Sequence, residues 1–155
     1  SCEPYKKIGI KTLKPFKIDK NIQAALRKIS NINSLLLKKK LFPLTLGGEH
    51  SITPGCIEPF TKNFKNLCIL HFDAHADLRQ SYNGEKFSHA SAIRRCLDHK
   101  NVSIISFGIR NISGSEVKYL NKNNHVIANA DNILVKVNSK EYNADEVGLL
   151  CCLTI

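Results

Sequence analysis

The sequence predicts an α/β fold built on a mostly parallel sheet. Segments with helical periodicity alternate with short, continuous apolar runs, a pattern typical of strands that are buried on both faces. Right-handed crossovers then place helices between strands, and binding sites form beyond the carboxyl ends of the strands. At 155 residues, 43% of them hydrophobic, the chain can bury the core of one domain, so we expect a single domain over residues 1–155.

The first elements are a helix, a strand and a second helix. Over residues 19–40 apolar side chains recur at three- and four-residue steps, which predicts an amphipathic helix with Asp19 as its N-cap. Residues 42–46 are a short apolar run and are expected to form a strand. Residues 51–64 then form a helix, which we expect to be interrupted near Pro54.

The alternation continues through the second half of the chain. We expect a buried strand over 67–72, a helix over 88–99, a strand over 102–107, a helix over 113–121 and a weaker strand near 125–127. After a polar stretch, residues 147–155 form an apolar run that stops without a cap. This end has the character of an interrupted chain.

Composition narrows the class of partner. Lys and Arg number 23 against 13 acidic residues, which gives a net charge of +10 and can signal nucleic-acid binding. The lysines are scattered without aromatic residues between them, so a solvated surface is favoured and nucleic acid is the lesser alternative. The six cysteines lack the spacing of a disulfide framework or a zinc site, and no apolar run could cross a bilayer. We therefore expect a cytoplasmic protein that binds neither nucleic acid nor membrane.

Two motifs carry the residue types of a metal site. Asp73, His75 and Asp77 stand at alternate positions after an apolar strand, where their side chains can converge. A Gly-Gly-Glu-His segment upstream supplies His50. Mixed imidazole and carboxylate ligands suit Mn²⁺, with zinc, cobalt or iron less favoured. The pattern predicts metal-dependent hydrolysis.

These motifs and their order resemble the ureohydrolases, the family of arginase and agmatinase, and more closely the agmatinase branch. Four segments carry the resemblance: residues 46–53, residues 71–78, residues 82–91 with Arg94 and Arg95, and residues 106–110. It extends over about residues 40–125, and four linked motifs are far more specific than one alone.

The resemblance implies a three-layer arginase-like fold, partial in this chain, with a binuclear manganese centre. His50, Asp73 and Asp77 would bind one ion, and Asp73 and His75 the other. A metal-bridging hydroxide would attack the guanidinium carbon, and His89 would shuttle a proton to the leaving amine or contact the substrate. The implied reaction is the hydrolysis of agmatine to putrescine and urea, a step of polyamine biosynthesis. Arginase or another guanidino hydrolase is the alternative.

Neighbouring polar residues have structural interpretations. Glu49 adjoins His50 but points elsewhere, which favours a supporting carboxylate. His71 lies in the buried strand and favours a hydrogen-bonded core histidine. Arg94 and Arg95 favour surface or salt-bridge roles, because they would repel a cationic guanidino substrate.

The sequence also departs from the family pattern. The later Asp-x-Asp-x-x-Asp-Pro segment, which supplies further bridging carboxylates, is not found, and the chain begins late, so it resembles a member incomplete at both ends. Two cations held close together need several negative ligands between them. One ion or none is therefore the alternative to two, and an inactive remnant or an oligomerisation subunit is the alternative function. A complete member is expected to form a homo-oligomer.

Overall fold

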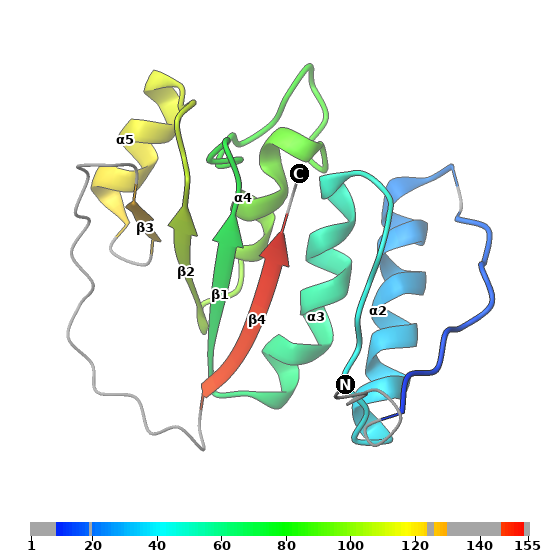
Figure 1. Cartoon of the computed structure of the whole chain (residues 1–155). Coiled ribbons are helices and arrows are strands. Elements are labelled where there is room, and N and C mark those ends of the chain that lie inside the picture. Colours follow the sequence, from blue (N-terminus) through cyan, green and yellow to red (C-terminus); the bar gives the residue numbers. More distant parts are fainter. Residues whose placement is uncertain (1–8, 19, 124–125, 130–146, 154–155) are drawn as a thin grey trace, which may run out of the picture.

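The computed structural model describes residues 9–18, 20–123, 126–129 and 147–153. Its centre is a four-stranded sheet in the order β3-β2-β1-β4, in which every pairing is parallel (Figure 1). The strands are β1 (Asn66–Phe72), β2 (Val102–Phe107), β3 (Val126–Asn129) and β4 (Val147–Leu153). The predicted parallel sheet is confirmed.

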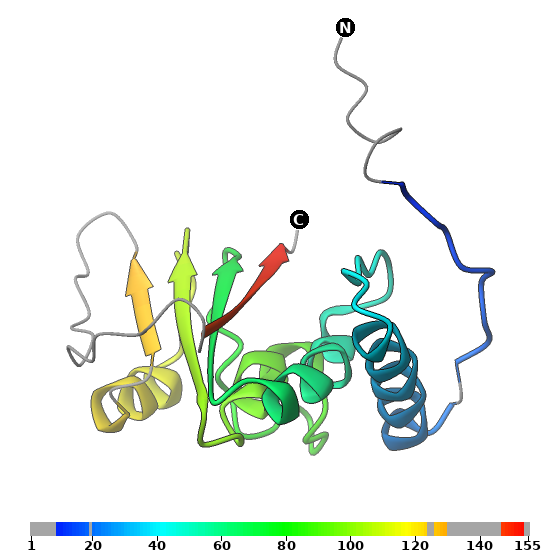
Figure 2. The ribbon, with the colours of Figure 1, turned by 90° about the horizontal axis from the view of Figure 1, so that it is seen from below.

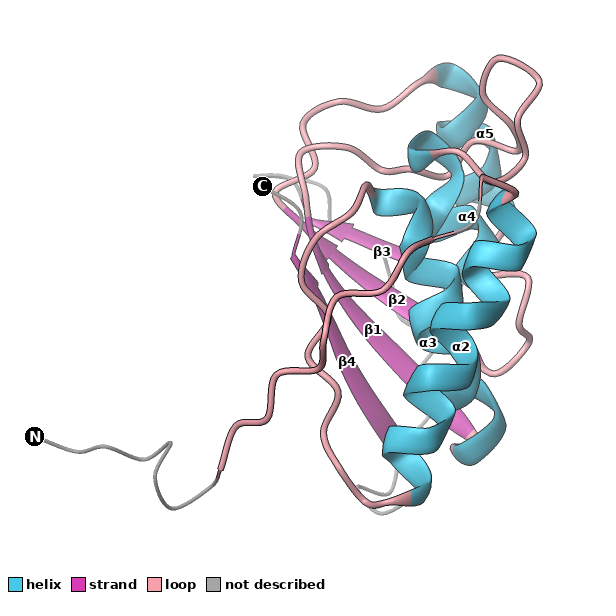
Figure 3. Ribbon diagram, turned by 90° about the vertical axis from the view of Figure 1, so that its right-hand side faces the viewer, coloured by secondary structure: helices cyan, strands magenta, loops and turns pink. Residues whose placement is uncertain are grey.

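The helices lie together on one face of this sheet (Figures 2 and 3). They are α2 (Ile22–Lys38), α3 (Thr53–Asn63), α4 (Ala92–Cys96) and α5 (Gly114–Lys122), with 3₁₀ turns η1 (His50–Ile52) and η2 (His89–Ser91). The described residues thus form two of the three predicted layers. None of the helices in these ranges is long and apolar enough to cross a membrane.

The helix starts differ from the sequence prediction. Asn21 caps α2, its side chain accepting a hydrogen bond from the Ala24 N–H at 3.0 Å, while the predicted cap, Asp19, lies outside the described residues. Pro54 does not interrupt its helix. It lies in the first turn of α3, where its missing N–H would have had no helical partner. The predicted helix over 88–99 is shorter, comprising η2 and α4.

The predicted strand over residues 42–46 is wrong. This segment pairs with no strand in the described part of the chain, and the side chains of Phe42, Leu44 and Leu46 are 84%, 76% and 85% exposed. An apolar run becomes a strand only where a neighbouring backbone supplies hydrogen bonds. The remaining strands fall at or close to the predicted residues, and the apolar run from residue 147 forms β4.

The stretch before α2, over residues 9–18, has no regular structure but is attached to that helix. The Lys28 ammonium donates a hydrogen bond to the Lys17 carbonyl at 2.7 Å and lies 5.3 Å from the centre of the Phe16 ring. A single lysine thus joins this segment to the outer side of α2.

The core lies between the helices and one face of β1 and β2. Leu67 and Ile69 on β1, and Ile104 on β2, are almost completely buried, and they pack with Ile57 of α3 and Ile93 of α4. Side chains alternate in burial along both strands, so the same inward face continues toward the carboxyl ends of the strands.

Helices α2 and α3 approach closely at Gly55. A methyl group built on Gly55 would lie 2.8 Å from the Leu26 carbonyl oxygen and 3.0 Å from the Leu26 Cα.

We therefore expect Gly55→Ala to reduce the free energy of unfolding by about 1–3 kcal/mol, because the helices must separate. Gly114→Ala is the control, since a methyl there meets nothing within 4 Å. Urea unfolding followed by circular dichroism measures both, and equal midpoints would contradict the close approach.

Candidate metal centre

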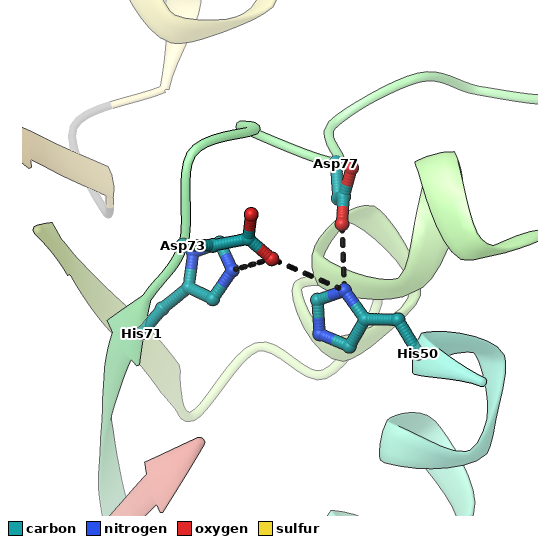
Figure 4. A group of neighbouring side chains, drawn as sticks. All are labelled: His50, His71, Asp73 and Asp77. Atoms are coloured by element: carbon teal, nitrogen blue, oxygen red, sulfur yellow. Dashed lines mark hydrogen bonds and ion pairs between the residues drawn. The ribbon is translucent and has the colours of Figure 1, made fainter. Parts of the chain in front are cut away.

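The two predicted motifs meet beyond the carboxyl ends of the strands (Figure 4). Asp73 follows directly after β1, and His50 begins η1 on the neighbouring connection. The backbone enters η1 through Gly47 and Gly48 with φ of +95° and +74°, values that residues with a Cβ rarely adopt. The glycine pair thus permits the turn that brings His50 to the end of β1.

His50, Asp73 and Asp77 form a compact group of side chains that are each at least nine-tenths buried. The Nδ1 atom of His50 lies 2.6 Å from Oδ2 of Asp77 and 3.8 Å from Oδ2 of Asp73. With His71 added, one potential ligand atom from each of these residues lies within 4.8 Å of all the others. Two carboxylates and an imidazole crowded together away from water form a donor set that fits a divalent cation.

The electrostatics of Asp73 keep it ionised. Burial by itself raises the pKa of this carboxyl. The hydrogen bond from the His75 backbone N–H, at 2.8 Å, and the nearby imidazoles of His71 and His50 lower the pKa. The lowering effects are larger together, so the pKa of Asp73 lies below its ordinary value. A carboxylate that keeps its negative charge at this depth is suited to a cation.

His71 is completely buried, as the interpretation of a core histidine requires. Its Nδ1 lies 3.0 Å from the Ser106 hydroxyl, its Nε2 lies 3.5 Å from Oδ2 of Asp73, and its ring stacks on His50 with centroids 5.5 Å apart. Burial, together with the charge of His50, lowers the pKa of His71. The sequence prediction does not include His71 among the ligands. The pattern that could have found it is the spacing of two residues between His71 and Asp73, which places both side chains on the same face of a strand.

His75 is not part of this buried group. Its side chain is 60% exposed, and its Nδ1 lies 3.3 Å from Oδ1 of Asp73. The alternation expected from a strand ends because β1 stops at Phe72 and Asp77 takes a left-handed conformation with φ of 50°. Ligation by His75 stays a prediction.

His89 lies at the rim of the site. Its Nδ1 is 3.6 Å from Oε1 of Glu49, both side chains are more than half exposed, and its ring meets the edge of Tyr82 at 5.4 Å between centroids. Together with His50, Asp73 and Asp77, these residues line an open cleft of about 1100 Å³. Glu49 also accepts a hydrogen bond from the Ser51 hydroxyl at 2.9 Å, consistent with a supporting carboxylate.

Arg95 has the expected salt-bridge role, whereas Arg94 packs against an aromatic ring. Arg95 is buried, with its Nε 3.0 Å from Asp98 and its terminal nitrogens donating to the backbone and side chain of Gln80. Arg94 lies over the Tyr119 ring, 3.5 Å from its centre. Neither lines the cleft that holds the buried carboxylates.

An α/β sheet with a histidine and two aspartates gathered beyond its strand ends defines a candidate metal-dependent enzyme. The chain matches the arginase family over residues 2–142. It therefore belongs to the arginase family.

Similar proteins include agmatinases. The chain is 43% identical over 91 residues to the agmatinase of Bacillus cereus, covering 58% of this chain and 31% of that protein. It is 31% identical over 131 residues to the agmatinase of Pyrococcus horikoshii, covering 84% and 41%. A solved structure of a putative agmatinase from Clostridium difficile matches with a TM-score of 0.66 at 26% identity, over 81% of this chain and 52% of that one. The chain thus spans less than half of these curated relatives and about half of the solved chain.

The position of Asp73 predicts the protonation of His71. An ionised carboxylate facing Nε2 favours the tautomer with its hydrogen on Nε2, leaving Nδ1 to accept from Ser106. Because the folded pKa is lowered, the unfolded state binds the extra proton first as pH falls, so His71 makes the fold less stable below about pH 6.5. We expect ¹⁵N spectra of the imidazole to show the Nε2–H tautomer and a midpoint below that value. A midpoint at or above it would contradict the assignment.

Proposed function

We propose that this chain contributes the metal-binding part of a ureohydrolase site that hydrolyses a guanidino compound, with agmatine as the first candidate substrate and putrescine and urea as products. One observation carries the proposal: His50 from one motif and Asp73 and Asp77 from the other converge on one buried point that lines an open cleft. Family membership supports the reaction class, and the similar agmatinases suggest the substrate.

We propose manganese as the metal. His50, Asp73 and Asp77 would hold it, and the contact of His75 with Asp73 makes His75 a candidate for binding a second ion. A bound divalent ion of this kind lowers the pKa of a water molecule, so that a hydroxide nucleophile is available near neutral pH. The buried carboxylates of Asp73 and Asp77 would offset the charge of such an ion.

The residues at the rim would handle the substrate and its proton. A guanidinium group is cationic, and Glu49, more than half exposed beside the cleft, offers it a carboxylate. The imidazole of His89, with its Nδ1 3.6 Å from Oε1 of Glu49, is placed to deliver a proton to the leaving amine. Exposure at the rim lets His89 recover a proton from solvent after each turnover.

A carboxylated guanidino substrate is the second candidate. Arg79 and Arg110 line the same cleft as the buried aspartates, and a guanidinium side chain pairs well with a substrate carboxylate. Arginine or a guanidino acid would use such a partner, whereas agmatine has no carboxylate.

Urea release from agmatine, arginine and 4-guanidinobutyrate, measured in parallel with manganese present, separates the two substrate candidates. Arg110→Ala should weaken only the carboxylated substrates.

Manganese binding tests the site directly. After manganese loading and removal of free ion, we expect the chain to retain metal, and Asp73→Asn and Asp77→Asn each to weaken retention by at least tenfold, because each removes a buried negative ligand. Glu58→Gln is the matched control, since Glu58 pairs with Lys62 on the surface of α3. Metal analysis by plasma mass spectrometry gives the number of manganese ions retained per chain. No retained metal in the unsubstituted chain would refute the proposal and favour the non-catalytic remnant or oligomerisation subunit.

His89 should affect the reaction without affecting the metal. We expect His89→Gln to reduce urea release by about 10²–10⁴-fold, the usual range for loss of a general acid, and to leave manganese retention unchanged. A colorimetric urea assay at saturating substrate measures the rate. A rate unchanged by the substitution would remove His89 from the mechanism.

A further inference from the structure

We infer that Glu116, on α5, is a positioning residue that holds Asp77 in the conformation in which it faces His50. The inference rests on the proposed metal site and extends it to a residue that lies outside both motifs. Glu116 is only 5% exposed, and it is the one acidic residue on α5.

The two carboxylate oxygens of Glu116 have different partners. Oε2 accepts hydrogen bonds from the Ser113 N–H at 2.8 Å and the Ser113 hydroxyl at 2.5 Å. The bond from the Ser113 N–H is the part that the carboxylate contributes to the capping box of α5. Oε1 accepts from the Leu78 N–H at 2.9 Å. Arg79 Nε lies 3.9 Å from Oε2 and partly offsets the buried charge. Oε2 thus caps the helix, and Oε1 accepts a hydrogen bond from the loop that carries Asp77.

The peptide group between Asp77 and Leu78 is bonded at both of its polar atoms. Its N–H donates to Glu116, and its carbonyl, on Asp77, accepts from the Arg94 N–H at 3.0 Å. These bonds fix the orientation of the peptide plane and hence ψ of Asp77. They do so where support is needed, because Asp77 has φ of 50°, in the left-handed region that residues with a Cβ seldom occupy.

Loss of Glu116 would release one side of this peptide group. The buried Leu78 N–H would lose its acceptor, and Asp77 could relax toward an ordinary backbone conformation that takes its carboxylate away from His50. A helix cap alone would not have this effect, since capping uses the other oxygen. The two roles can therefore be separated by substitution.

The experiment compares Glu116→Ala with Ser113→Ala in the full chain. Both remove part of the α5 cap and should lower the thermal unfolding midpoint, but only Glu116→Ala removes the acceptor of the Leu78 N–H. We expect Mn²⁺ affinity, measured from the free-ion signal in electron paramagnetic resonance, to fall by about tenfold or more in Glu116→Ala and by less than about threefold in Ser113→Ala. The visible absorption of bound Co²⁺ should change only in Glu116→Ala.

A measurement without metal separates the possible failures. Hydrogen exchange of the Leu78 amide should accelerate in Glu116→Ala and stay slow in Ser113→Ala. Equal metal affinity and equal Co²⁺ spectra in the two variants would overturn the positioning role while leaving the proposed function intact. If the unsubstituted chain binds no Mn²⁺ although the Leu78 amide is protected, the proposed function fails, and the positioning role is overturned with it because Glu116 is then only a structural contact.

Discussion

The contact of 2.6 Å between the His50 imidazole and the Asp77 carboxylate joins two parts of the chain that reach the site independently. His50 lies in η1, between α2 and α3, and Asp77 lies in the loop after β1. His50 begins a short 3₁₀ turn, and Asp77 lies in a loop, so neither candidate ligand is held by a long helix or a strand. Each is fixed instead by neighbours: a glycine pair before His50, and hydrogen bonds from α4 and to Glu116 around Asp77.

The site continues the hydrophobic core on the same face of the sheet. Residues paired across β1 and β2 change from Ile69 beside Ile104 to His71 beside Ser106, and all four are buried. Each strand therefore supplies apolar packing in its middle and a polar support at its carboxyl end. The buried His71, hydrogen-bonded to Ser106 and facing Asp73, links the packing of the sheet to the candidate ligands.

The sequence predicted the central strands and three of the helices closely, because periodicity and burial act together there, whereas the helix expected over 88–99 is reduced to η2 and α4. β2 has the predicted residues and β1 begins one residue early. The strand over 42–46 was wrong because hydrogen-bonding partners, which periodicity does not report, decide whether an apolar run pairs. For the candidate site, residue types predicted His50, Asp73 and Asp77, and the structure brings these three side chains together. The contribution of His71 and the exposed position of His75 depend on where β1 ends and on the left-handed Asp77, neither of which a spacing rule contains.

The pairing of β4 with β1 affects how the protein is made. Asn66 of β1 aligns with Val147 of β4, so this edge of β1 is completed by a strand synthesised long after it, whereas β2 follows β1 closely along the chain. Pairing between distant segments slows folding, because a long loop must close before any contact forms. During translation the helices, β1 and β2 can associate while the other edge of β1 stays open. An unpaired strand edge of this kind is where a partly folded chain is most prone to aggregate.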